Sequence, residues 1–156
     1  TSGTQAVLAY NFGAGKTDRV KSAQKYIFIL AAAYTALLFV LARTIGVLFV
    51  RLFTADPIVA AEALRAIRIF TLAIIPLAFQ YEIVDGFTGL GQVQVSLPLS
   101  FFRKCAYFVS LFLLPAMFGA EAAFYAEPVS DILGPIASAI VYLTSMKKVL
   151  AKAGAN

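Results

Sequence analysis

The chain has 156 residues, of which 61% are hydrophobic and 13% are charged. Soluble domains average ~45–50% apolar and ~25% charged residues, so this composition excludes an ordinary water-soluble domain and predicts an integral membrane protein. The net charge of +5 does not indicate nucleic-acid binding, because the basic residues lie between apolar stretches instead of forming one face. The sequence has no histidine, which removes imidazole bases and most zinc sites, so we expect no enzymatic activity, cofactor or metal centre.

Four apolar stretches are long enough to cross a bilayer, since ~30 Å of hydrocarbon requires about 20 helical residues. The candidate spans cover residues 26–48, 64–87, 93–118 and 121–146. Residues 1–15 look like the last turns of a preceding helix and its exit. The predicted fold class is therefore all-α and integral to the membrane, with four antiparallel transmembrane helices plus the end of a preceding one.

The segments between the spans contain turn-forming residues. Residues 49–63 interrupt the apolar pattern with charges and an Asp-Pro pair, and we expect them at the outer surface. Gly89 and Gly91 predict a tight turn on the cytoplasmic side, because glycine adopts the positive φ angles that such turns need. Within the second span, Pro76 predicts a kink.

The distribution of basic residues predicts the orientation of the spans. One group precedes the first span and another follows the last, which places both groups in the cytoplasm under the positive-inside rule. The residues are Lys16, Arg19, Lys21, Lys25, Lys147, Lys148 and Lys152. The number of spans after Lys16 must then be even.

Charged residues inside the spans are candidate functional residues, because an ionisable side chain at the bilayer centre costs ~2.5–3.5 kcal/mol on insertion scales. Glu82 and Asp85 are three residues apart, so they share one helix face and could offer oxygens to a proton or Na⁺. The alternative is that both are solvated at the cytoplasmic rim. Asp85 lies ~7 Å and Glu82 ~12 Å from the predicted turn.

Arg103 and Lys104 lie near the middle of the third span, ~15 Å from its start. Arg103 there needs a carboxylate partner, which the second span could provide through Glu82 and the fourth through Asp131. Glu127, four residues before Asp131, belongs to the same acidic face. A buried ion pair of this kind could fix the register of the helices or take part in ion coupling, and both roles stay open.

Seven short motifs follow one another along the chain in a characteristic order. They are Gly3-Thr4-Gln5, Tyr10-Asn11-Phe12-Gly13-Ala14, residues 16–20, residues 52–57, Arg65-Ala66-Ile67-Arg68, residues 86–91 and Pro128-Val129-Ser130-Asp131. Their order and spacing resemble the multidrug and toxic compound extrusion (MATE) family. The resemblance implies twelve helices in two six-helix lobes. It makes residues 1–156 the C-terminal part of the second lobe, with the N-terminal lobe of the same protein as a missing partner.

The resemblance also implies a function, multidrug efflux by exchange of small organic cations or drugs for H⁺ or Na⁺ across the plasma membrane, with alternating access of the two lobes. It implies a coupling carboxylate on the tenth helix, here the second span. Glu82 is the nearest deep carboxylate and Gln80 is an equally near position; if the coupling ion is Na⁺, it could bind at Glu82. Aromatic side chains that could attract a flat cation are Phe79, Tyr81, Phe102, Tyr107 and Phe108.

Two alternatives stay open. One is a flippase for lipid-linked oligosaccharides of the same superfamily, which the basic pair Arg103 and Lys104 weakly favours. The other, outside transport, is a membrane enzyme or an assembly subunit.

Overall fold

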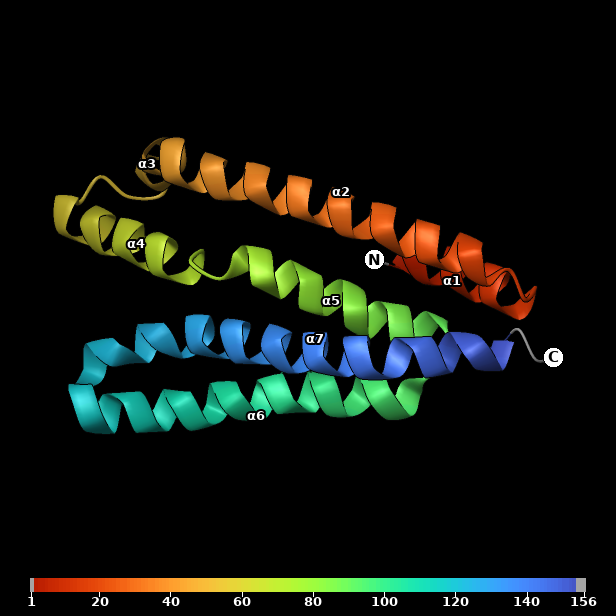
Figure 1. Cartoon of the computed structure of the whole chain (residues 1–156). Helices are drawn as coiled ribbons and strands as arrows, with labels where there is room; N and C mark the ends of the chain where they lie inside the picture. Colours follow the sequence, from red (N-terminus) through yellow and green to blue (C-terminus); the bar gives the residue numbers. More distant parts are fainter. Residues whose placement is uncertain (1, 154–156) are drawn as a thin grey trace.

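The structure, a computed structural model, describes residues 2–153, with side chains from 3 to 151, and is built from antiparallel helices (Figure 1). The helices are α1 (Ser2–Gly13), α2 (Thr17–Thr44), α3 (Gly46–Arg51), α4 (Pro57–Phe70), α5 (Ile74–Gly89), α6 (Val93–Phe118), the 3₁₀ helix η1 (Ala120–Tyr125) and α7 (Ala126–Ala153). Residues 2–153 contain no β-strand, which confirms the predicted all-α class.

Three helical segments are long and apolar enough to cross a membrane: Thr17–Thr44, Val93–Phe118 and Ala120–Ala151. The second of these has the bounds predicted from the sequence. The first begins nine residues before the predicted position 26, because the basic turn at its start is already helical. The last begins as a 3₁₀ turn and continues beyond residue 146. The predicted count of four spans is not confirmed, since the stretch over residues 64–87 is not one helix.

That stretch is divided into α4 and α5 by a turn at residues 71–73. The kink expected at Pro76 therefore lies about one turn earlier in the chain. Pro76 has no N–H to donate to the carbonyl of Leu72, and its ring would collide with that carbonyl, so a continuous helix is broken before the proline. Pro76 instead lies in the first turn of α5, where backbone N–H groups have no intrahelical acceptor. Figure 1 shows α4 and α5 following each other in the same overall direction beside α2.

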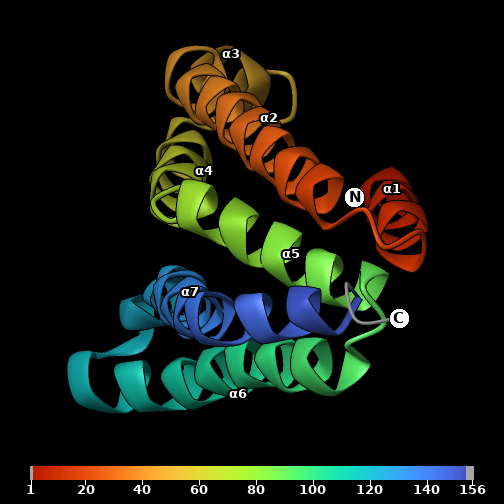
Figure 2. The ribbon, with the colours of Figure 1, turned by 45° about the vertical axis from the view of Figure 1, so that its right-hand side comes forward.

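The helix α5 lies in the middle of the bundle, between α2 on one side and the α6–α7 pair on the other (Figure 2). Its C-terminal half packs into the main hydrophobic core, where Phe87 is fully buried against residues of α1, α2, α6 and α7. In contrast to this core, the outer faces of α2 and α6 expose large apolar side chains, such as Leu30, Leu37, Phe101 and Phe112. Such faces are typical of helices that contact lipid or another apolar partner.

The start of α2, the α5–α6 turn and the end of α7 lie at the same end of the bundle (Figure 1). This end holds the basic side chains before the first span together with Lys147 and Lys148, while the side chain of Lys152 lies outside the described part. The segment between α2 and α4 lies at the opposite end. This arrangement agrees with the predicted orientation, whose sidedness stays a prediction.

Candidate functional site

Three consecutive residues of α5, Gln80, Tyr81 and Glu82, contact different parts of the bundle. Successive residues of an α-helix are rotated by about 100°, so neighbours in sequence point in different directions. Glu82 lines a cavity against α2, the hydroxyl group of Tyr81 meets Arg103 of α6, and Gln80 packs on Gly134 of α7. The central position of α5 thus brings three polar side chains into three helix interfaces.

Glu82 lies in a cavity of about 250 Å³ between α2 and α5. The other lining side chains are four aliphatic ones, two tyrosines and one threonine: Ala31, Tyr34, Thr35, Ile74, Leu77, Ala78 and Tyr81. Glu82 Oε2 is buried and has no hydrogen-bond partner among the described residues. A carboxylate oxygen without a partner in an apolar cavity is costly, so this site is suited to a proton or another cation.

Asp85 does not share the Glu82 cavity. Its Oδ1 accepts a hydrogen bond from Gln5 Nε2 at 2.9 Å, which ties the end of α5 to α1. Within residues 2–153 no three His, Cys, Asp or Glu side chains are grouped so that they could hold a metal ion. The two carboxylates that the sequence places on one helix face therefore have separate surroundings.

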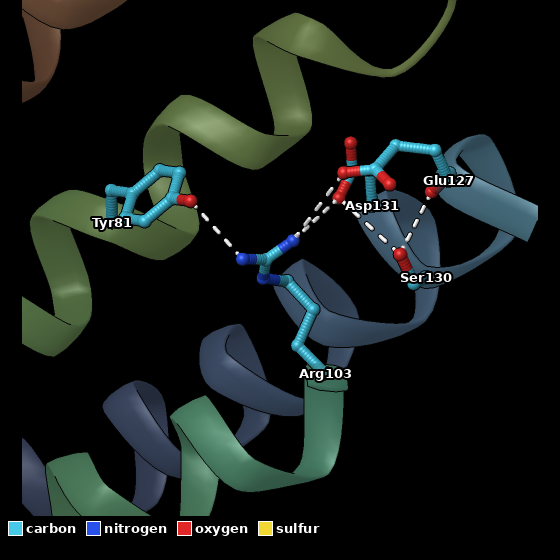
Figure 3. A network of polar contacts seen from close by, with 5 residues as sticks. All are labelled: Tyr81, Arg103, Glu127, Ser130 and Asp131. Atoms are coloured by element: carbon cyan, nitrogen blue, oxygen red, sulfur yellow. Dashed lines mark hydrogen bonds and ion pairs between the residues drawn. The ribbon is translucent and has the colours of Figure 1, made fainter. Parts of the chain in front are cut away.

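Arg103 lies between α5 and α7 and contacts both (Figure 3). Its Nη1 is 3.1 Å from Asp131 Oδ1 and 4.0 Å from Glu127 Oε1, and its Nη2 donates a hydrogen bond to the Tyr81 hydroxyl at 3.1 Å. Arg103 is 7% exposed and Asp131 2% exposed. The guanidinium therefore links α5, α6 and α7 through one charge-compensated contact in the interior.

Of the two partners left open for Arg103, the structure places Asp131 at the guanidinium. Glu82 forms no ion pair in the described part of the chain, because it faces α2, and Tyr81 faces Arg103 instead. The Arg103 Cζ atom also lies 5.4 Å from the centroid of the Tyr81 ring. Tyr81, expected to attract an external cation, thus contacts a cation of the chain itself.

Gln80 is 2% exposed, and its Oε1 has no hydrogen-bond partner within the described residues. A Cβ atom at position 134 would overlap the Gln80 amide, so glycine at this position lets α5 and α7 approach closely. Gly86 and the buried Gln24 make the same arrangement between α5 and α2. Gln80 therefore lies at a helix interface and does not line the Glu82 cavity.

Comparison with known proteins assigns the chain to a family. A sequence model of the MatE family matches residues 1–113. The chain belongs to the MatE family. MatE proteins are membrane transporters and not enzymes, so the long apolar helices of this MatE chain are membrane helices of a transporter. Searches of curated proteins and of solved structures gave no match.

The matched residues of this MatE chain include α1 to α5 and most of α6. Glu82, Asp85, Gln80 and Arg103 thus lie in the matched region, whereas Glu127 and Asp131 lie beyond it. The ion pair of Arg103 therefore joins a residue inside the match to a residue outside it.

Proposed function

We propose that this chain is part of a multidrug efflux transporter of the plasma membrane that exchanges small organic cations or drugs for H⁺ or Na⁺. The N-terminal lobe of the same protein would complete the central cavity, and transport would proceed by alternating access of the two lobes in the bilayer. The observation that carries the proposal is the unpartnered Glu82 carboxylate in the cavity between α2 and α5.

The surroundings of Glu82 suit an organic cation. Tyr34 and Tyr81 provide aromatic faces, which attract a cation through their π-systems, and the remaining walls are mostly apolar. Binding sites for small molecules commonly combine an apolar lining with a few polar groups that fix the orientation. Glu82 is the acidic group of this cavity and would be the counter-ion.

The same carboxylate gives a physical reason for exchange. One buried negative charge can be neutralised by H⁺, by Na⁺ or by a cationic drug, and the first ligand removes the attraction for the next. A ligand shifts the conformational equilibrium only by its differential affinity for the two states. If the outward-open and inward-open states differ in their access to Glu82, binding of the coupling ion on one side promotes drug release on that side.

The test uses the full-length protein that contains this chain, in inverted membrane vesicles. Movement of a fluorescent organic cation is followed under an imposed proton gradient and then under a sodium gradient. We expect Glu82→Gln to lower gradient-driven movement at least tenfold, because the amide keeps the size of the side chain and removes its charge. Asp85→Asn is the matched control, since Asp85 contacts Gln5 outside the cavity, and it should keep most of the activity.

The gradient that drives movement identifies the coupling ion. Undiminished movement in Glu82→Gln would place coupling elsewhere in the protein and refute the role of Glu82. Failure of both gradients to move the dye in the wild-type protein would refute cation exchange. The flippase alternative would then be tested with a fluorescent lipid-linked saccharide in the same vesicles.

A further inference from the structure

A second cavity, also of about 250 Å³, lies between α5 and α6. It is lined by Gln80, Tyr81, Val84, Ser100, Arg103 and Lys104. Tyr81 lines this cavity as well as the Glu82 cavity, so the two cavities adjoin the same side chain. Tyr81 is 48% exposed, which leaves part of it available to a ligand.

Lys104 brings to the α5–α6 cavity a positive charge that pairs with no carboxylate among the described side chains. The charge of Arg103 is compensated by Asp131, at 3.1 Å, and Glu127 lies farther away, at 4.0 Å. Lys104 is exposed, and none of the ion pairs between described side chains includes it. It lies eleven residues after Val93, ~16 Å into the 26-residue helix α6, at a depth where an unpaired ammonium group is expensive. An anionic partner would remove this cost.

Two of the side chains that line this cavity also carry hydrogen-bond donors. The Tyr81 hydroxyl accepts a hydrogen bond from Arg103 Nη2, so its own proton remains available to an acceptor. Lys104 adds an ammonium group with three donors and no acceptor. An ionised carboxylate is the matching chemistry, because it only accepts hydrogen bonds and binds most strongly to charged donors.

We propose that the α5–α6 cavity binds the carboxylate of transported molecules that carry both charges, with Lys104 as the counter-ion and the cationic end of the molecule at Glu82. The inference rests on the proposed function, since it uses Glu82 as the cation site. The two counter-ions have opposite sign and adjoin the two cavities that share Tyr81, so a flat molecule could lie along the Tyr81 side chain with one charge in each cavity. Lys104 would then determine which substrates are preferred without taking part in ion coupling.

The test compares two dyes that differ in one group, a rhodamine with a free carboxylate and the methyl ester of the same dye. Binding and transport of each are measured with the purified and reconstituted full-length protein. We expect Lys104→Met to raise the apparent KM and the Kd of the acid about tenfold and to leave those of the ester unchanged. Lys104→Arg, which keeps the charge, should bind the acid within about twofold of the wild type.

Three results would overturn the inference. Equal losses for acid and ester in Lys104→Met would mean that Lys104 supports the structure, for example by pairing with a carboxylate elsewhere in the protein. Unchanged binding of the acid in Lys104→Met would remove the counter-ion role. Weaker binding of the acid than of the ester by the wild-type protein would exclude an attractive site for the carboxylate, a measurement that needs no variant to fold.

The same dyes separate this inference from the proposed function. Glu82→Gln should weaken transport of both dyes, because both carry the cationic end. If Glu82→Gln leaves the ester unaffected, the proposed function fails. If Glu82→Gln impairs the ester while Lys104→Met spares the acid, the proposed function stands and the inference about Lys104 is refuted.

Discussion

The ion pair in the interior of the bundle leads to a prediction of stability that can be worked out from its distances. Asp131→Asn keeps the shape of the side chain but removes the charge that lies 3.1 Å from Arg103. At an effective dielectric constant of ~20, two unit charges at that distance attract each other by ~5 kcal/mol before desolvation is counted. Glu127, at 4.0 Å, would remain as a weaker counter-ion for Arg103. Removing one partner of a buried pair costs ~3–5 kcal/mol, and because Glu127 remains we expect a loss of about 3 kcal/mol.

The measurement is the free energy of unfolding of the purified full-length protein in mixed micelles of a mild and a denaturing detergent, followed by circular dichroism. The matched control is Glu127→Gln. The side chain of Glu127 is 39% exposed, and an exposed pair contributes ~0–1 kcal/mol. The double variant Arg103→Met with Asp131→Leu should recover most of the loss, because it leaves no buried charge without a partner.

Two results would contradict this account of the pair. If Glu127→Gln costs as much as Asp131→Asn, the two carboxylates share the guanidinium equally and the 3.1 Å contact is not the dominant one. If the loss of unfolding free energy in the double variant equals the sum of the losses in Arg103→Met alone and Asp131→Leu alone, Arg103 and Asp131 stabilise the protein independently of each other.

Two further predictions concern packing and orientation. A Cβ atom at Gly89 would lie 2.9 Å from the backbone oxygen of Gln5, so Gly89→Ala should cost ~1–3 kcal/mol of stability in the same assay. Gly3→Ala, with no neighbour within 4 Å, should be neutral or gain up to ~1 kcal/mol, and equal effects at the two positions would disprove the close approach of α1 and α5. After Cys105→Ser, a membrane-impermeant maleimide should label Ala55→Cys in intact cells but Lys148→Cys only after permeabilisation. The reverse pattern would invert the predicted orientation.

The limits of α6 could be predicted from the sequence because glycines stand at both of its ends. Gly91 and Gly119 have φ angles of +72° and +89°, a backbone region that residues with a side chain rarely adopt, so the chain turns at these positions. The choice of partners for Arg103 could be narrowed in the same way. Counting residues from the turn between α6 and α7 places Asp131 at a depth similar to that of Arg103. The position of a residue along the helix axis can thus be predicted from the sequence.

The direction in which a side chain points around the helix axis cannot be predicted by counting residues. Counting from the Gly89–Gly91 turn brings Glu82 close to the level of Arg103, yet the structure turns Glu82 toward α2 and presents Tyr81 to Arg103 instead. The break at residues 71–73 could be predicted from Pro76, although it lies about one turn before the proline. The directions of Tyr81 and Glu82, in contrast, depend on how α5 packs against three neighbouring helices at once.

The ionisable groups of α5 and α6 can be divided into those that form an ion pair within the chain, for which we expect a structural role, and those that do not, for which we expect a functional role. Every charge in the hydrocarbon region must be neutralised, and a pair that is neutralised within one chain needs no ligand. Arg103 and Asp131 satisfy each other, so we expect this pair to fix the register of the helices. Glu82 and Lys104 form no ion pair in the described part of the chain, although each lines a cavity. If their counter-ions come from outside these helices, as we propose, transport variants at these two positions are expected to be the most informative.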